Sequence, residues 1–315
     1  MTQQHNSESL IDAVIIGGGA TGLQAALTLA RIRRSVVLLD SGEYRNKAVA
    51  HMHNFITHDG DSPANLRKQA LSELTNYDTV DVRFIRAEDI AVGEGEFSVA
   101  LSGGDVPRAR CLILATGMAD ILPEKPGLAP LWGNLAAQCP FCHGYEYRGQ
   151  HLGVLGAVAG PHVSILLESI ADKITIFADR EELSPAKRDS LTARGVVLRE
   201  ESVVGFERSA GGEVVVHLDG TDDVQVASIF LTPEQVQAAP FAEKLGLEML
   251  PSGAIRIDDM GRTSMTGVYA AGDLAHVPAL PMPLPSVLAG AAAGQRAASA
   301  LATDLMVGEN PWILS

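Results

Sequence analysis

Short apolar runs alternate with small-residue turns and helix-forming stretches along most of the chain. Residues 12–16 form an apolar, β-prone run, and a glycine-rich stretch over residues 17–22 follows it directly. Residues 23–33 are rich in alanine and leucine and predict a helix, and residues 35–39 predict a second buried strand that ends at Asp40. A strand, tight turn, helix and strand in this order predict a βαβ unit with a parallel sheet.

The same order of elements returns in the middle of the chain. Residues 152–156 predict a strand, residues 161–171 a helix and residues 173–177 a further strand, and Asp179 then takes the place that Asp40 has in the first unit. This internal repeat predicts an α/β fold with two Rossmann-like dinucleotide-binding domains. We expect the first domain to span residues 1–121 and 244–315, and the inserted second domain to span residues 122–243.

The first glycine-rich turn has the residue types that a dinucleotide site requires. Gly17 permits the tight turn, Gly19 lets the backbone approach a pyrophosphate, and Gly22 lets the helix pack close to the strand. The helix that begins near Ala20 presents free N–H groups and a positive dipole end to phosphates. Asp40 can accept hydrogen bonds from ribose hydroxyls. These features together predict a bound dinucleotide.

Two later apolar strands also end in small-residue turns. The strand at residues 111–114 ends in Ala115-Thr116-Gly117, and the strand at residues 267–271 ends in Gly272-Asp273. With the first turn, these segments resemble the flavoprotein reductases that have two dinucleotide-binding domains, and the resemblance spans nearly the whole chain. It implies FAD as the cofactor, with Asp273 on a ribityl hydroxyl.

The chain contains three cysteines, and two of them form the motif Cys139-Pro-Phe-Cys142. Two cysteines at this spacing indicate either a redox dithiol or half of a zinc site, and a structural accident is the third alternative. No second pair of zinc ligands stands out, which favours the redox pair and predicts no metal. Cys111 lies in a predicted buried strand and is expected to be inert.

The position of the redox motif narrows the resemblance. The cysteine pair lies in the second domain, and this location is similar to that in the thioredoxin-reductase branch of the family. The segments 139–146, 40–46 and 51–55 resemble those of a sub-branch of dithiol oxidases. Those enzymes close intramolecular disulfides in small molecules such as gliotoxin and holomycin. The resemblance implies a small dithiol substrate, O2 as the electron acceptor with H2O2 as product, and a homodimer. The lysine-poor, arginine- and alanine-rich composition favours the bacterial, holomycin-type member.

The resemblance implies the roles of the two cysteines: Cys139 is the outer sulfur that a substrate thiolate attacks, and Cys142 faces the flavin. His143 is the candidate general base, because it is adjacent to Cys142 and an imidazole has a suitable intrinsic pKa. Glu146 lies three residues further on and is the expected orienting partner of His143, provided that this stretch forms a helical turn. His51, His53 and His276 are weaker candidates for the base. The residues expected to hold FAD are Gly17, Gly19, Ala20, Gly22, Asp40, Arg45, Asn46, Asn54, Ala115, Thr116, Gly117, Gly272, Asp273 and Ser286.

The second nucleotide-binding turn departs from the pattern of the first. Val158 stands where the first turn has Gly19, and Pro161 stands where it has Gly22. Residues 178–182 contain three acids around one arginine, where NADPH enzymes of this branch have a basic cluster. The sequence therefore predicts that the second domain does not bind NAD(P)H. The alternatives are a thioredoxin reductase linked to NAD(P)H or ferredoxin, and a non-catalytic FAD redox sensor or thiol-sequestering protein.

Charge excludes two classes of partner. The chain carries 24 lysines and arginines against 38 acids, a formal charge of −14. Such a chain repels phosphate backbones and anionic lipid surfaces, so we expect neither a nucleic-acid nor a membrane partner.

No apolar run approaches the ~20 residues that span a bilayer. Residues 1–10 lack the features of a signal peptide, which predicts a cytoplasmic protein.

Overall fold

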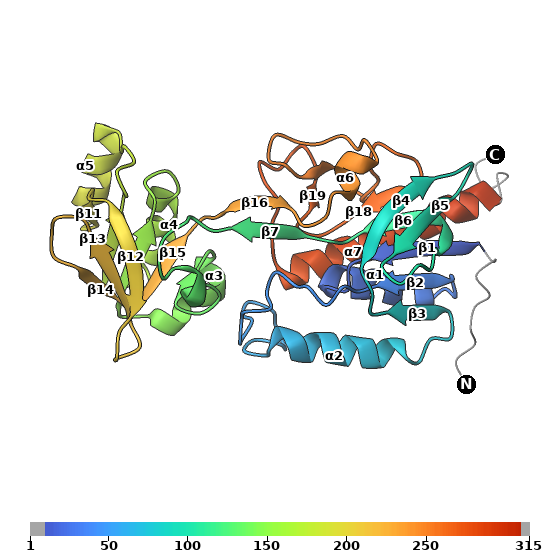
Figure 1. Cartoon of the computed structure of the whole chain (residues 1–315), viewed down its shortest axis with the longest axis horizontal. Coiled ribbons are helices and arrows are strands. Elements are labelled where there is room, and N and C mark those ends of the chain that lie inside the picture. The colour runs from blue at the N-terminus through green and yellow to red at the C-terminus, as the bar shows by residue number, and fades with distance from the viewer. Residues whose placement is uncertain (1–9, 310–315) are drawn as a thin grey trace. The chain divides into compact units, whose positions relative to one another are not determined.

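The computed structural model describes residues 10–309, which form two compact units (Figure 1). The first unit takes its described residues from Met1–Arg45, Ala64–Ala119 and Gln235–Ser315, and the second consists of Asn46–Pro63 and Asp120–Glu234. The segment 46–63, which we had expected in the first domain, is therefore grouped with the second. Close packing accounts for this grouping, because a Cβ atom on Gly133 would lie only 2.8 Å from the Cβ of Ala48.

The first unit is built on a seven-stranded sheet in the order β3-β2-β1-β6-β5-β4, and β18, which lies off this path, also pairs with β6. Strands β1, β2, β3, β6 and β18 pair with one another in parallel, whereas β5 pairs antiparallel with both β6 and β4. The strands are β1 (Ile11–Ile16), β2 (Val36–Leu39), β3 (Val80–Arg83), β4 (Ala87–Val92), β5 (Phe97–Leu101), β6 (Arg108–Leu114) and β18 (Val268–Ala270).

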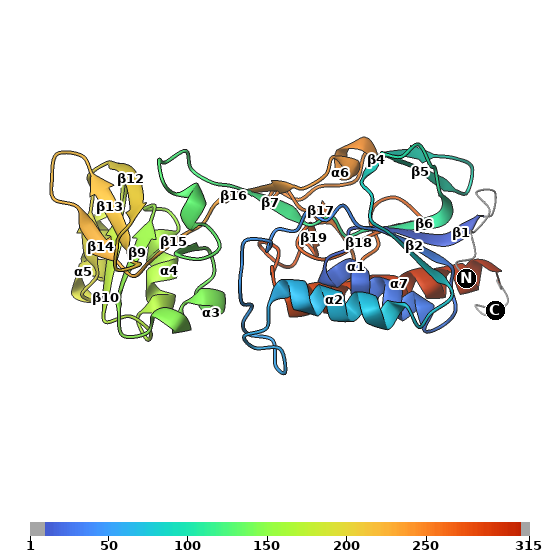
Figure 2. The same ribbon diagram turned by 60° about the horizontal axis from the view of Figure 1, so that its bottom comes forward.

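Three helices cover one face of this sheet, as Figure 2 shows. Leu23, Leu29 and Ala297 are buried with side chains of β1, β2 and β6 in one apolar cluster. Parallel strands that are buried on both faces need such continuous apolar runs. The helices are α1 (Ala20–Ala30), α2 (Pro63–Leu74) and α7 (Val287–Glu309), and the unit also contains α6 (Phe241–Lys244), β17 (Ile255–Arg256) and β19 (Ala275–His276).

The second unit repeats the architecture on a smaller scale. Its five-stranded sheet has the order β11-β10-β9-β15-β8, and all its pairs are parallel. A three-stranded antiparallel sheet, β12-β13-β14, packs in the same unit. The elements are η1 (Ala129–Leu131), β8 (Ala136–Ala137), α3 (Pro140–His143), η2 (Tyr145–Tyr147), β9 (His151–Leu155), α4 (Gly160–Leu167), β10 (Lys173–Phe177), α5 (Pro185–Ala193), β11 (Val197–Arg199), β12 (Val203–Arg208), β13 (Val214–Leu218), β14 (Val224–Val226) and β15 (Ser228–Leu231).

The chain passes between the units twice, through β7 (Met118–Ile121) and β16 (Glu234–Gln237), which pair with each other. The two parallel sheets confirm the predicted fold class. The helix expected over residues 161–171 already ends at Leu167. Among the described residues, no helix has the length and apolar character to cross a membrane.

Candidate active site

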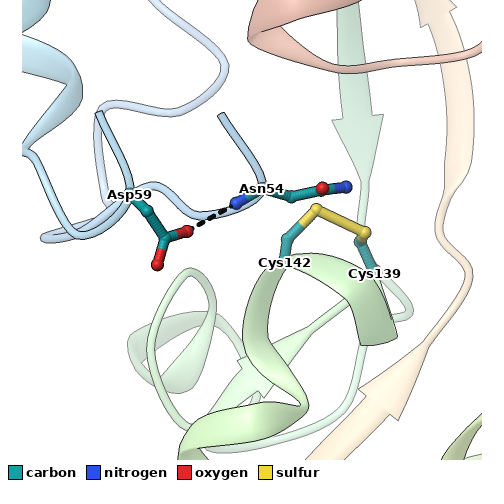
Figure 3. Close-up of a disulfide and its surroundings, with 4 residues drawn as sticks. All are labelled: Asn54, Asp59, Cys139 and Cys142. Carbon is teal, nitrogen blue, oxygen red and sulfur yellow. Dashed lines mark hydrogen bonds between the residues drawn. A yellow bond between two sulfur atoms is a disulfide. The ribbon is translucent and has the colours of Figure 1, made fainter. Parts of the chain in front are cut away.

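The two cysteines of the Cys-Pro-Phe-Cys motif form a disulfide at the start of α3. Cys139 immediately precedes the helix, Cys142 lies within it, and their Cα atoms are 5.3 Å apart. Pro140 occupies the first helical position, where its fixed φ and missing N–H cost nothing. The turn thus holds both sulfurs within bonding reach, and the expected pairing is confirmed. Figure 3 shows the side chain of Asn54 beside this disulfide.

His143 ends α3 directly after Cys142, and its imidazole is enclosed. Neither ring nitrogen has a hydrogen-bond partner among the described residues, and both nitrogens are buried. Burial lowers the pKa of His143 below its usual 6.5; Glu146 opposes this shift and His53 adds to it. The ring is therefore neutral near pH 7, and a neutral imidazole can accept a proton. Buried polar atoms without partners are costly and uncommon, which marks this side chain as a functional candidate.

Glu146 does not pair with His143 as expected. Its carboxylate lies 3.6 Å from Nε2 of His53, whose Nδ1 lies 3.5 Å from the carboxylate of Asp59. The helical turn that we predicted does form, but the segment 46–63 packs against it and brings His53 into reach. Glu146 therefore acts on His143 only through space, by the charge that opposes the lowering of its pKa.

The other two histidine candidates are engaged in hydrogen bonds. Nδ1 of His51 contacts the carbonyl oxygen of Gly60 at 2.9 Å. His276 is buried, with one ring nitrogen on the hydroxyl of Ser252 and the other on the carbonyl oxygen of Val277. His276 thus has a structural role.

The first glycine-rich turn has the geometry of a dinucleotide site. Gly17 has φ +120°, and a Cβ there would lie 2.2 Å from the carbonyl oxygen of Ala115. A Cβ on Gly22 would lie 1.9 Å from the carbonyl oxygen of Gly17, whereas one on Gly19 would meet nothing within 4 Å. No side chain caps the N-terminus of α1. The turn is therefore tight where the protein packs and open where a pyrophosphate would lie.

Asp40 lies under this turn with 2% of its surface exposed. Its carboxylate accepts hydrogen bonds from the backbone N–H of Gly42 at 2.9 Å and from the hydroxyl of Tyr44 at 2.5 Å. The guanidinium of Arg67 stacks 3.8 Å from the centre of the Tyr44 ring, and burial together with Asp40 raises the pKa of Tyr44 to about 12. A carboxylate has about four acceptor positions, so two remain for ribose hydroxyls. Sequence reasoning missed Tyr44 and Arg67.

The remaining expected FAD residues of the first unit gather around the same edge of the sheet. Asp273 accepts a 3.0 Å charge-assisted hydrogen bond from Arg45. The hydroxyl of Ser286 accepts from the N–H of Ala289 and so caps α7. Thr116 and Gly117 follow β6 directly, next to the turn that holds Gly17. These residues fit the pyrophosphate and ribityl portions of a flavin dinucleotide.

Asn46 and Asn54 belong to the segment that is grouped with the second unit. Asn54 has φ +63°, a conformation that asparagine tolerates better than most residues, and its N–H donates to Asp59 at 2.8 Å. Its side chain is thereby held next to Cys142 (Figure 3).

The second nucleotide-binding turn, between β9 and α4, differs from the first in its side chains and in the partners of its N–H groups. Val158 projects outward with 80% of its surface exposed. One carboxylate oxygen of Glu181 accepts hydrogen bonds from the N–H groups of Ala157 at 2.6 Å and Val158 at 3.3 Å. Asp179, the counterpart of Asp40, pairs with Lys125 at 2.6 Å and accepts from the N–H of Val203. The second turn therefore uses its polar groups internally.

Two dinucleotide-type folds, with a redox-active disulfide carried by the second, define a class of oxidoreductases that act on disulfide or thiol groups. The chain belongs to the pyridine nucleotide-disulphide oxidoreductase family, whose model matches residues 11–298. This family implies a flavin cofactor, typically FAD.

Individual relatives agree with this assignment. The chain is 32% identical over 322 residues to "Thioredoxin reductase tcpT" of Claviceps purpurea, covering 95% of this chain and 97% of that protein. It is 35% identical over 278 residues to "Thioredoxin reductase aclD" of Aspergillus oryzae, covering 84% and 88%. The crystal structure of HlmI matches with a TM-score of 0.89 at 35% identity, covering 98% of this chain and 96% of that chain. An oxidoreductase from Agrobacterium tumefaciens matches with a TM-score of 0.86 at 32% identity, covering 95% and 99%. The predicted resemblance to thioredoxin reductases is confirmed.

Proposed function

We propose that this protein is an FAD-dependent dithiol oxidase. It closes an intramolecular disulfide in a small natural-product dithiol, such as a dithiolopyrrolone or an epidithiodiketopiperazine, and passes the two electrons to O2 to give H2O2. The observation that carries the proposal is the altered second nucleotide turn, where Val158 and Pro161 replace the glycines of the first turn. Without a nicotinamide site, a substrate dithiol is the electron source that the site itself offers, because its thiols can exchange with the Cys139–Cys142 disulfide.

The chemistry at the disulfide follows from the residues around it. A substrate thiolate attacks Sγ of Cys139, which forms a mixed disulfide and releases Cys142 as a thiolate. The second substrate thiol then displaces Cys139, so the substrate leaves as a closed disulfide and both cysteines are reduced. The first glycine turn and Asp40 would hold FAD, which would supply the two-electron redox chemistry between the reduced cysteines and O2.

His143 supplies the base that these steps need. Thiols have an ordinary pKa near 8.5, so at neutral pH most substrate molecules must lose a proton to react. The buried, neutral imidazole of His143 lies next to Cys142 and has a free lone pair to accept that proton. Phe141 and Tyr145 flank the pair with two-thirds of their surfaces exposed, and they offer apolar contact area to a small dithiol.

The test compares electron donors under anaerobic conditions. We expect a small dithiol to bleach the flavin absorbance of the yellow protein within seconds, and NADPH to leave it unchanged. Admission of air then restores the colour and yields one H2O2 per disulfide formed. Rapid bleaching by NADPH would instead support the alternative, an NAD(P)H-linked thioredoxin reductase that acts on protein disulfides. Several relatives are named as thioredoxin reductases.

Cysteine variants test the roles of the two sulfurs. Cys139→Ser leaves Cys142 as an unpaired thiolate, and we expect a long-wavelength charge-transfer band with oxidised flavin. Cys142→Ser abolishes flavin reduction and shows no such band. Cys111→Ala is the matched control, because Cys111 is 5% exposed and burial raises its pKa to about 12. The reverse pattern would interchange the roles of Cys139 and Cys142, and full activity in both serine variants would refute the dithiol mechanism.

We further propose that the protein works as a homodimer, which sedimentation of the purified protein tests.

A further inference from the structure

The two nucleotide-binding turns of this chain share a backbone plan but differ in what lies against them. In the first turn, the space beside Gly19 is open, and no side chain caps the helix that follows. In the second turn, a carboxylate of the chain itself lies against the N–H groups of Ala157 and Val158. The contact closes a loop of more than twenty residues, because Glu181 comes from the segment after β10.

We propose that Glu181 is a specificity-determining residue that keeps phosphate-bearing nucleotides out of the second fold. Its carboxylate satisfies two N–H groups that would otherwise be directed at a pyrophosphate. It also places a negative charge where a phosphate would have to lie, so an incoming anion must both displace the side chain and meet its repulsion. The inference deepens the proposed oxidase activity, which rests on the absence of a nicotinamide site at this same second turn.

The surroundings of Glu181 strengthen the exclusion. The one basic residue of the stretch 178–182, Arg180, forms an ion pair with Asp219 at 2.9 Å. Lys125 pairs with Asp179 at 2.6 Å, so this cation is also engaged. Glu182 adds a second exposed carboxylate next to Glu181 in the chain. An anion that approaches this turn therefore finds the N–H groups of Ala157 and Val158 already hydrogen-bonded. The neighbouring cations, Arg180 and Lys125, are already in ion pairs.

Tethering makes the internal carboxylate a strong competitor. A group held on the same chain acts at an effective concentration of about millimolar or higher. A free anion that binds the N–H groups as tightly as the Glu181 carboxylate does must exceed this concentration before it replaces the side chain. An anion that binds more weakly needs a proportionally higher concentration. Removal of the carboxylate should therefore unmask anion affinity that the backbone retains, even with Val158 in place.

The experiment measures binding of inorganic pyrophosphate to the FAD-loaded protein by calorimetry at constant ionic strength. We expect Glu181→Ala to bind pyrophosphate at least about tenfold more tightly than the wild type. Glu182→Ala is the matched control, because it removes the same charge from the adjacent residue and should behave as the wild type does. Glu181→Gln keeps the length of the side chain and should give an intermediate gain of about threefold, so the test stands even where the alanine variant folds poorly.

Three results would overturn the proposal. One is equal affinity of the wild type and both Glu181 variants, whether strong or absent. Another is an equal gain in Glu182→Ala, which would assign the effect to net charge rather than to the hydrogen-bonded carboxylate. The third is pyrophosphate binding to the FAD-loaded wild type at micromolar concentration. None of these results depends on whether the protein oxidises dithiols, so a failure here is distinguishable from a failure of the proposed function.

Discussion

Helices α1 and α7 approach so closely that one added methyl group should force them apart. Gly294 of α7 lies against the backbone of Thr21 in the first turn of α1. A Cβ atom on Gly294 would be 2.1 Å from the carbonyl oxygen of Thr21 and 2.9 Å from its carbonyl carbon. Because the obstacle is backbone, no change of rotamer relieves the clash, and Gly294→Ala must move one helix relative to the other.

The magnitude follows from two opposing terms. Overpacking of a well-packed interior costs about 1–3 kcal/mol, and a clash with backbone at this distance lies at the upper end of that range. Replacement of a helical glycine by alanine returns about 1 kcal/mol of helix propensity. The expected net loss is therefore about 2 kcal/mol of the free energy of unfolding. With an m-value of about 4 kcal/mol/M for a chain of this size, the urea midpoint should fall by about 0.5 M.

Two other glycines of α7 provide graded controls. A Cβ on Gly308 would meet nothing within 4 Å, so Gly308→Ala should stabilise the protein by about 0.5 kcal/mol. A Cβ on Gly290 would approach only the mobile hydroxyl of Thr21, at 2.7 Å, and should have an effect near zero. Urea unfolding at saturating FAD, followed by circular dichroism, ranks the three variants, and the FAD content of each is measured after gel filtration. A Gly294→Ala protein as stable as Gly308→Ala would refute the reasoning.

Two further predictions concern titration and a partly buried hydrogen bond. Burial lowers the pKa of His143, so the contribution of this residue to the free energy of unfolding is fully present above about pH 6.5 and is lost as the pH falls below that value. His143→Asn should lack this loss of stability in urea titrations from pH 7.5 to 5. The same variant should also lack the acidic limb in the pH profile of flavin reduction by a dithiol. Tyr269→Phe removes a 2.6 Å hydrogen bond to the carboxylate of Asp304 and should lower the free energy of unfolding by about 1.5–3 kcal/mol, whereas the exposed Tyr145→Phe should change it by less than about 0.5 kcal/mol.

Local patterns predicted the first nucleotide turn and the redox pair. The turn depends on residues adjacent in sequence, and the structure shows the geometry that their types require: Gly17 at positive φ, Gly22 against backbone, and Asp40 beneath the turn. The Cys139–Cys142 bond likewise joins residues three apart on one helical turn. In such cases the chain spacing already fixes the distance in space, so sequence reasoning has little left to determine.

Contacts between distant segments could not be predicted in the same way. The pairing of Glu146 with His53 depends on how the segment 46–63 packs, and helical spacing alone favoured His143 as the partner. Residues 178–182 were interpreted as an acidic stretch unsuited to a 2′-phosphate, and this stays a prediction. An acidic stretch in a loop nevertheless has the sequence of an ordinary solvated surface, and only the fold shows that Glu181 reaches the N–H of Ala157.

The two repeats share one backbone plan but differ in the partners of the N–H groups at the glycine turn. The N-terminal end of a helix after a glycine turn leaves N–H groups that need a partner, whether a bound phosphate or the protein itself. In the first repeat, Asp40 lies beside an open turn. In the second repeat, Asp179 forms an ion pair with Lys125, and the carboxylate of Glu181 accepts hydrogen bonds from the N–H groups of the turn. The second fold thus satisfies these N–H groups with a side chain of its own chain. It also carries the disulfide and His143, which supports the proposal of an enzyme that takes its electrons from thiols.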